Sequence, residues 1–150
     1  MKSEQIKSKE FISGLITSLL GLIFGMSLVI TGSLLTWRSD PVLNIFKLSG
    51  IQFHGLTNSD GTITLVLGIV GLIALLSGAI FHNSLHYTLA LTCSIVTVLL
   101  SLSEICFVLA GSGIVTPGHG LYMILGGAIV GVFTSLCGYS ISREKPKKVV

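Results

Sequence analysis

The sequence carries very little charge between its two ends. Asp, Glu, Lys and Arg make up 10% of the 150 residues, whereas soluble domains carry about 25%. The charged residues between positions 11 and 142 are Arg38, Asp40, Lys47, Asp60 and Glu104. So few charges cannot cover the surface of a water-soluble fold, but they suffice where lipid covers the surface. The scarcity of charge therefore excludes an ordinary soluble domain.

Cysteine and histidine are also scarce, and neither occurs in a pattern typical of a catalytic or metal site. Cys93, Cys106 and Cys137 form no Cys-x-x-Cys pair, which a thiol oxidoreductase would need. His82 and His86 are four residues apart, a metal-ligand spacing on a helix, but no Asp, Glu or Cys lies near them in the sequence. Phosphate loops, serine elbows and dinucleotide fingerprints are absent as well. We therefore expect no enzyme activity, no cofactor and no bound metal.

What the sequence has is four long apolar runs. They cover residues 11–37, 62–81, 85–111 and 118–142. Each reaches the length of about 20 residues that a helix needs to cross the hydrocarbon core of a bilayer. The first run is too long for a cleaved signal peptide, so we expect it to be retained. Because backbone groups in lipid must bond within their own segment, the runs predict an all-α membrane protein. Its single domain would be an antiparallel four-helix transmembrane bundle.

Lysine and arginine predict the orientation of this bundle. They are concentrated on the side that holds both termini, at Lys2, Lys7, Lys9, Arg143, Lys145, Lys147 and Lys148. The other side has only Arg38 and Lys47. The positive-inside rule therefore places both termini in the cytoplasm of a cell-membrane protein. These basic residues flank apolar runs and are not interleaved with aromatics, which argues against nucleic-acid binding.

Several residues near the ends of the runs indicate where the membrane interfaces lie. Trp37 is expected in an aromatic belt at the outer end of the first helix, and Tyr87 and Tyr139 in a belt at the inner interface. Pro117 is expected in the first turn of the fourth helix, where its missing N–H costs nothing.

Glycine recurs at helical spacing in three of the runs. Steps of three, four or seven residues keep the glycines on one face, and small residues allow membrane helices to approach closely. The expected packing glycines are Gly14, Gly21, Gly25, Gly32, Gly68, Gly71, Gly78, Gly120, Gly127, Gly131 and Gly138. Two interpretations of these glycines remain open. They can pack helices within one bundle, which we favour, or form a seam between two copies of the chain.

Glu104 is the one carboxylate inside a predicted span. It continues a line of small or polar residues spaced by three or four, formed by Ala90, Ser94, Thr97 and Ser101. We expect this polar stripe to face the bundle, with His119 and Tyr122 at similar depth and Arg38 within reach from the first helix. Three roles remain open for Glu104: a structural lock, proton- or ion-coupled transport, and contact with a partner subunit.

The first outer loop, residues 38–61, is the only sizeable segment outside the predicted spans. Residues 42–48 and 51–56 predict two short strands around Ser49 and Gly50, hence a short extracellular β-hairpin. Such a hairpin can cover the helix ends or offer an edge to another protein.

The order of these features resembles the claudin-type plan. It consists of a helix ending at Trp37, a strand-rich loop containing Gly55 and Leu56, and three further helices with short loops. Thr57 stands where that family has a second Trp, and the loop lacks its cysteine pair. The stretch through Asp60 and Gly61 resembles small uncharacterised prokaryotic four-helix membrane proteins with a claudin-like topology. This resemblance implies a fold and a membrane location, but no established activity.

These features predict a multi-pass integral membrane protein with a non-catalytic, structural or accessory-subunit role. It would act through its helix packing faces and its first outer loop, with Trp37, Arg38, Gly55, Leu56 and Asp60 as the loop residues of interest. Its partners would be the lipid bilayer and either a second copy or another membrane protein. The alternative is a small proton- or ion-coupled transporter or channel that uses Glu104.

Overall fold

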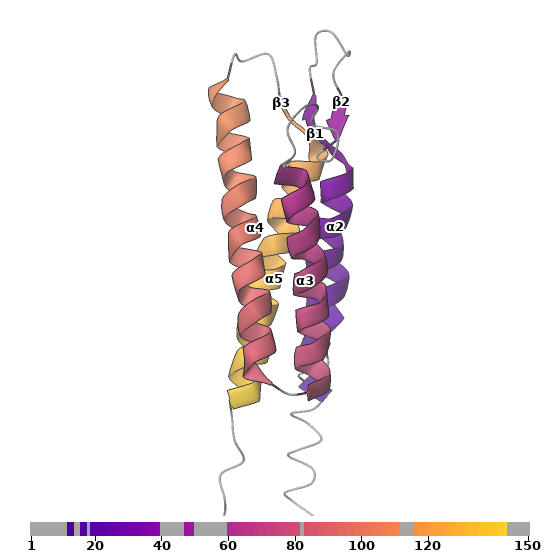
Figure 1. Cartoon of the computed structure of the whole chain (residues 1–150), viewed down its shortest axis with the longest axis vertical. Coiled ribbons are helices and arrows are strands. Elements are labelled where there is room, and N and C mark those ends of the chain that lie inside the picture. Colours follow the sequence, from indigo (N-terminus) through magenta and orange to yellow (C-terminus); the bar gives the residue numbers. More distant parts are fainter. Residues whose placement is uncertain are drawn as a thin grey trace, which may run out of the picture.

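Long helices lie side by side in this chain and form an elongated bundle (Figure 1). The computed structural model describes residues 12, 13, 16, 17, 19–39, 47–49, 60–81, 83–111 and 116–143. The long helices are α3 (Asp60–Phe81), α4 (Ser84–Ala110) and α5 (His119–Arg143). In the first apolar run, the π-helix η1 (Gly21–Met26) leads directly into α2 (Ser27–Leu34).

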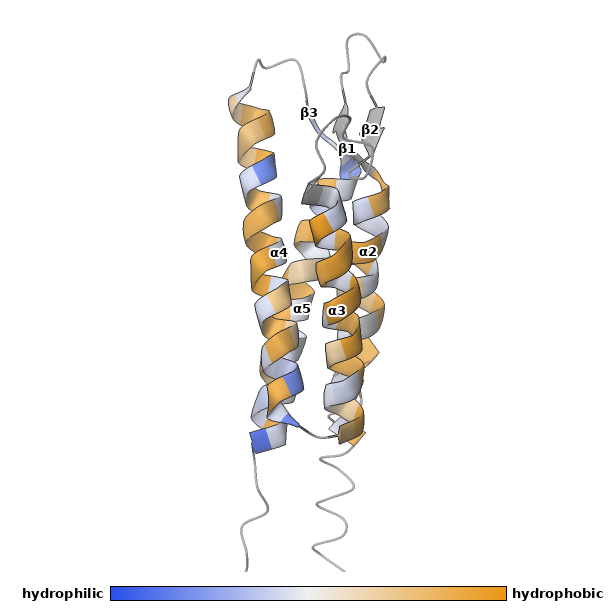
Figure 2. Ribbon diagram, viewed as in Figure 1, coloured by the Kyte–Doolittle hydropathy of each residue, from blue (hydrophilic) through white to orange (hydrophobic). Residues whose placement is uncertain are grey.

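Three of the helices are long and apolar enough to cross a membrane. The qualifying segments are Gly61–Phe81, Ser84–Ala110 and His119–Arg143, with 21, 27 and 25 residues. Figure 2 shows hydrophobic residues along the full length of the bundle. Large apolar side chains point outward, among them Ile73, Leu99 and Phe133 with 56%, 62% and 64% of their surface exposed. An apolar exterior of this kind is consistent with a multi-pass membrane protein.

Three short strands lie together at one end of the bundle, which we call the strand end (Figure 1). They are β1 (Thr36–Ser39), β2 (Lys47–Ser49) and β3 (Thr116–Pro117), in the order β2-β1-β3. Both pairings are antiparallel, with Ser39 opposite Lys47 on one side and opposite Thr116 on the other. At the opposite end, which we call the turn end, α3 and α4 are joined through Asn83, whose side chain caps α4 by accepting the Leu85 N–H at 3.0 Å.

The first helix ends earlier than residue 37, where the sequence placed its end. α2 stops at Leu34 and β1 starts at Thr36, so Trp37 belongs to a strand. The Trp37 indole Nε1 donates to the Gly32 carbonyl at 3.0 Å, and the Leu35 N–H donates to the same carbonyl at 3.2 Å. These bonds satisfy the Gly32 carbonyl, which lies in the last turn of the helix and therefore has no intrahelical donor. Trp37 is only 5% exposed, so its expected place in a lipid-facing aromatic belt is wrong.

The positions expected for the hairpin strands and for Pro117 also need correction. The first half of β1, Thr36 and Trp37, comes from residues expected to be helical. β1 pairs with β2, which overlaps the predicted strand 42–48 only at its end. The predicted strand 51–56 lies outside the described residues. Pro117 lies in β3 and α5 begins at His119. β3 is an outer strand of the sheet, where a residue without an N–H is tolerated.

The buried side chains form two clusters along the bundle. The first contains Trp37 and the second contains Tyr87. Their members are Val29, Trp37, Ile105, Leu121, Ile124 and Ala128 in the first, and Met26, Ala74, Leu75, Tyr87 and Ala90 in the second. Tyr87 is 2% exposed, so its expected place in an interfacial belt is wrong as well. Its ring fits inside because Gly78 and Gly138 present no side chain to it.

Candidate functional site

The polar stripe of α4 lies in the interior of the bundle. Ser94, Thr97 and Ser101 are 1%, 2% and 0% exposed. Ser94 Oγ donates to the Ala90 carbonyl and Thr97 Oγ1 to the Cys93 carbonyl, both at 2.8 Å. Ser101 Oγ donates to a carbonyl of α4 as well, at 3.0 Å. Bonds to the carbonyl one turn back satisfy a hydroxyl donor where water is absent. The stripe is therefore a line of small, internally bonded side chains.

Glu104 continues this stripe toward the strand end and is half-buried. The next residue, Ile105, belongs to the cluster around Trp37. The two residues expected near Glu104 on α5 do not join the stripe in the interior. Tyr122 has 54% of its surface exposed, and His119 is exposed at the first position of α5. The structure thus brings Ser94, Thr97 and Ser101 together but leaves His119 and Tyr122 on the outside of the bundle.

The glycines of the first run and of α5 bring two backbones into contact. A Cβ added at Gly127 would lie 2.6 Å from the Gly25 carbonyl oxygen and 3.0 Å from the Val29 nitrogen. A Cβ added at Gly25 would lie 3.3 Å from the Gly127 oxygen and from the Gly131 nitrogen. Backbone atoms cannot move aside as a flexible side chain can. These positions therefore require glycine for the observed helix spacing.

Other glycines make room for large side chains in the interior. A Cβ at Gly71 or at Gly131 would lie 2.8 or 3.0 Å from the Met26 methyl carbon. Gly21 faces Thr134, Gly32 faces Ile124, and Gly68 faces Val29 and Ile30. Gly120 is buried, and Gly14 lies outside the described residues. The described contacts of these glycines join helices of the same bundle.

One polar contact between helices was missed by the sequence analysis. Ser33 Oγ of α2 and Thr64 Oγ1 of α3 lie 3.1 Å apart, and both residues are 0% exposed. Each hydroxyl also reaches a carbonyl of its own helix, that of Val29 or Gly61. The sequence contained a signal for this pair, because Thr64 lies four residues before Gly68, on the glycine face of α3.

Ser135 is a second interior residue that the sequence analysis missed. It is fully buried, and among the described residues its Oγ is the buried side-chain oxygen without a hydrogen-bond partner. It lies four residues after Gly131 and three before Gly138, so it shares the inward face of α5.

The structure describes some of the loop residues of interest and not others. Trp37 is buried, and both Trp37 and Arg38 belong to the central strand β1. Asp60 is the first residue of α3. Gly55 and Leu56 lie outside the described part of the chain.

Comparisons with protein-family models, curated proteins and solved structures found no match to this chain. A functional proposal therefore has to rest on the contacts described above.

Proposed function

We propose that this chain is a non-catalytic, multi-pass membrane protein that serves as a structural or accessory subunit in the cell membrane. In this proposal the first apolar run is a fourth span, both termini are cytoplasmic and the strand end is extracellular. The three long apolar helices support the multi-pass arrangement. The concentration of lysine and arginine near the two termini supports the orientation. The claudin-like order of elements agrees with it.

Contacts between helices support an antiparallel bundle. Gly138 of α5 contacts Tyr87 of α4, and Gly131, seven residues earlier, lies next to Ser94, seven residues later. A step toward the start of α5 thus corresponds to a step toward the end of α4. For α3 and α4, Gly78 contacts Tyr87 and Gly71 lies near Cys93, which gives the same relation.

The observation that carries the proposal is the packing of the interior. The hydroxyls of the polar stripe donate to carbonyls of α4 itself, and Met26 and Tyr87 fill the space that the glycines leave. Transporters instead use discontinuous helices and unpaired backbone groups around a central site. A bundle whose interior is filled in this way is suited to a fixed scaffold.

The strand end supplies the surface for a partner in this proposal. β2 and β3 are the outer strands of the described sheet, and an outer strand can pair with a strand of another protein. The sheet is joined to the start of α5, because the Gly118 N–H donates to the Trp37 carbonyl of β1 at 2.7 Å.

Copurification from the native membrane in mild detergent tests the accessory role. We expect a membrane protein to elute with the chain at a fixed ratio. Replacing residues 42–48 with a Gly/Ser segment of equal length should abolish this association, whereas the control Gly126→Ala should retain it. A wild-type chain that elutes alone, at the size of the chain in detergent, would contradict the proposal.

The second candidate is a proton- or ion-coupled transporter, favoured by two observations. Glu104 is half-buried within a span, and η1 is a π-helix, an irregularity that often marks functional sites. Proteoliposomes that contain the wild type or Glu104→Gln separate the two candidates. The accessory role predicts equal, background flux of protons and ions for both proteins. Flux that Glu104→Gln abolishes and Glu104→Asp retains, with unchanged folding, would establish transport.

A further inference from the structure

Arg143 and Tyr139 form a polar contact at the turn end of the bundle. The Arg143 guanidinium carbon lies 4.9 Å from the centre of the Tyr139 ring, one turn earlier in α5. Such a stack is favourable because the face of an aromatic ring attracts a cation. A stack of this kind engages the face of the guanidinium, so the N–H donors at its edge can still bind another group.

The interior of the bundle holds the Tyr139 ring in place. Tyr139 packs against the buried cluster that contains Tyr87 and Ala90. The preceding residue, Gly138, is in contact with the Tyr87 ring. Arg143 itself is exposed, at the last position of α5. A cation that is positioned before binding loses less conformational entropy when a ligand arrives, so this geometry favours binding.

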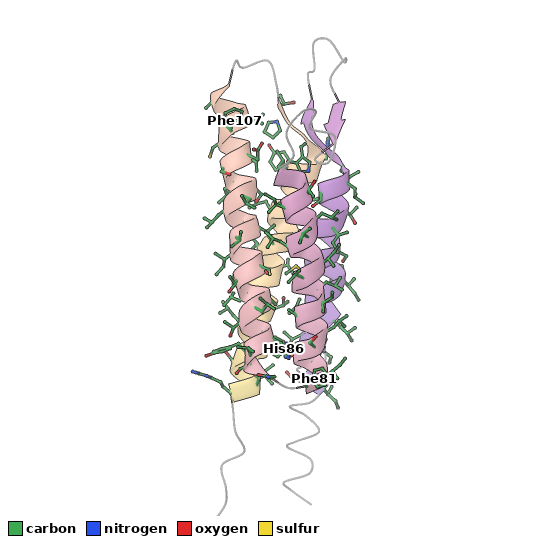
Figure 3. All side chains as sticks on the ribbon, in the orientation of Figure 1. Phe81, His86 and Phe107 are labelled. Atoms are coloured by element: carbon green, nitrogen blue, oxygen red, sulfur yellow. The ribbon has the colours of Figure 1, made fainter. Side chains whose placement is uncertain are left out.

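The turn end, where α5 ends at Arg143, carries side chains suited to the boundary between lipid tails and headgroups. Phe81 and Leu85, on either side of the link between α3 and α4, are each 70% exposed. The His86 ring lies 6.1 Å from the Phe81 ring, and Figure 3 shows both at the turn end, where α5 also ends. The exposed Phe81 and Leu85 suit the lipid tails, and His86, with an apolar body and a polar tip, is typical of the layer next to them.

We propose that Arg143, stacked on Tyr139, binds the phosphate of an anionic phospholipid headgroup in the leaflet at the turn end. Guanidinium groups bind phosphate oxygens through paired N–H donors. The partial negative charge at the C-terminus of α5 and the carboxylate of Glu144 oppose an anion, but Arg143 and the following Lys145, Lys147 and Lys148 outweigh them in charge. This inference depends on the membrane placement in the proposed function, and it adds a lipid class and a residue pair.

Native mass spectrometry of the full chain in mild detergent tests this inference. The probes are phosphatidylglycerol and phosphatidylcholine with the same acyl chains. We expect wild type to retain phosphatidylglycerol preferentially. Arg143→Ala should reduce that preference by clearly more than fivefold, because about fivefold is the general effect of one basic residue near an anionic surface. Tyr139→Leu should also reduce it although no charge is lost, and Arg143→Lys should restore only part of it.

Lys147→Ala is the matched control, because it removes one positive charge from the same terminus and leaves both residues of the stack unchanged. A reduction equal to that of Arg143→Ala, or no effect of Tyr139→Leu in a folded protein, would overturn the inference in favour of general electrostatic attraction. Equal retention of both lipids by a wild-type chain that still sediments with membranes would refute the headgroup site alone. A chain found in the aqueous fraction would instead refute the proposed function.

Discussion

A methyl group added at Gly127 would enter space that the backbone of η1 and α2 occupies. The new Cβ would lie 2.6 Å from the Gly25 oxygen, 2.8 Å from the Leu28 Cβ and 3.0 Å from the Val29 nitrogen. Two of these three atoms belong to the backbone, so relief requires the two helices to move apart. Overpacking of this kind typically costs about 1–3 kcal/mol.

The adjacent residue provides a matched control. Gly126 is exposed, and a Cβ added there meets no described atom within 4 Å. Gly126→Ala and Gly127→Ala share the gain in helix propensity of up to about 1 kcal/mol. The difference in stability between the two variants therefore isolates the packing cost.

Reversible unfolding of both variants by SDS titration in mixed micelles, followed by circular dichroism, measures this difference. We expect Gly127→Ala to be less stable than Gly126→Ala by about 1–3 kcal/mol. Equal stability of the two variants would refute the reasoning that backbone contact sets the spacing of the first helix and α5.

Three further predictions concern other interior contacts. In a double-mutant cycle of Ser33→Ala and Thr64→Ala, we expect a coupling energy of about 0.6 kcal/mol, which is the average for hydrogen bonds between membrane helices. A coupling energy of zero would show that the 3.1 Å contact between the two hydroxyls contributes nothing to stability. Tyr87→Ala should lower the free energy of unfolding by about 3–5 kcal/mol, because the ring is 2% exposed and its removal leaves a cavity. Gly138→Ala should destabilise the wild type but not the Tyr87→Ala variant, and an equal effect in both would contradict the proposed fit of ring and glycine.

The helical framework was largely predictable because its cause is compositional. The described helices α3, α4 and α5 begin and end within two residues of the predicted runs 62–81, 85–111 and 118–142. Apolar runs bounded by Asp60, Asn83 or Gly111 leave few other places for a membrane helix to begin or end. The inward orientation of the polar stripe on α4 was also predictable, because its small residues are spaced by three or four.

The parts that sequence did not reveal depend on long-range contacts. Trp37 looked like the end of a helix because apolar character does not distinguish a helix from a buried strand. Its true setting depends on pairing between β1 and β3, which lie far apart in the chain. Tyr87 looked interfacial because its position between Gly78 and Gly138 requires knowing which helices are neighbours. The π-helix η1 was likewise not predictable, because no residue pattern within an apolar run distinguishes a π-helix from an α-helix.

The pairing of Arg38 with Pro117 has a consequence for the order of biosynthesis. β1 leaves the ribosome long before β3, so its bonds to β3 have to wait until most of the chain has been made. A chain truncated after Gly111 would retain α2, α3 and α4 but lose every bond that β1 makes to the later segment. The sheet at the strand end can therefore be completed only after residues 116 and 117 have been made, just before α5 is synthesised.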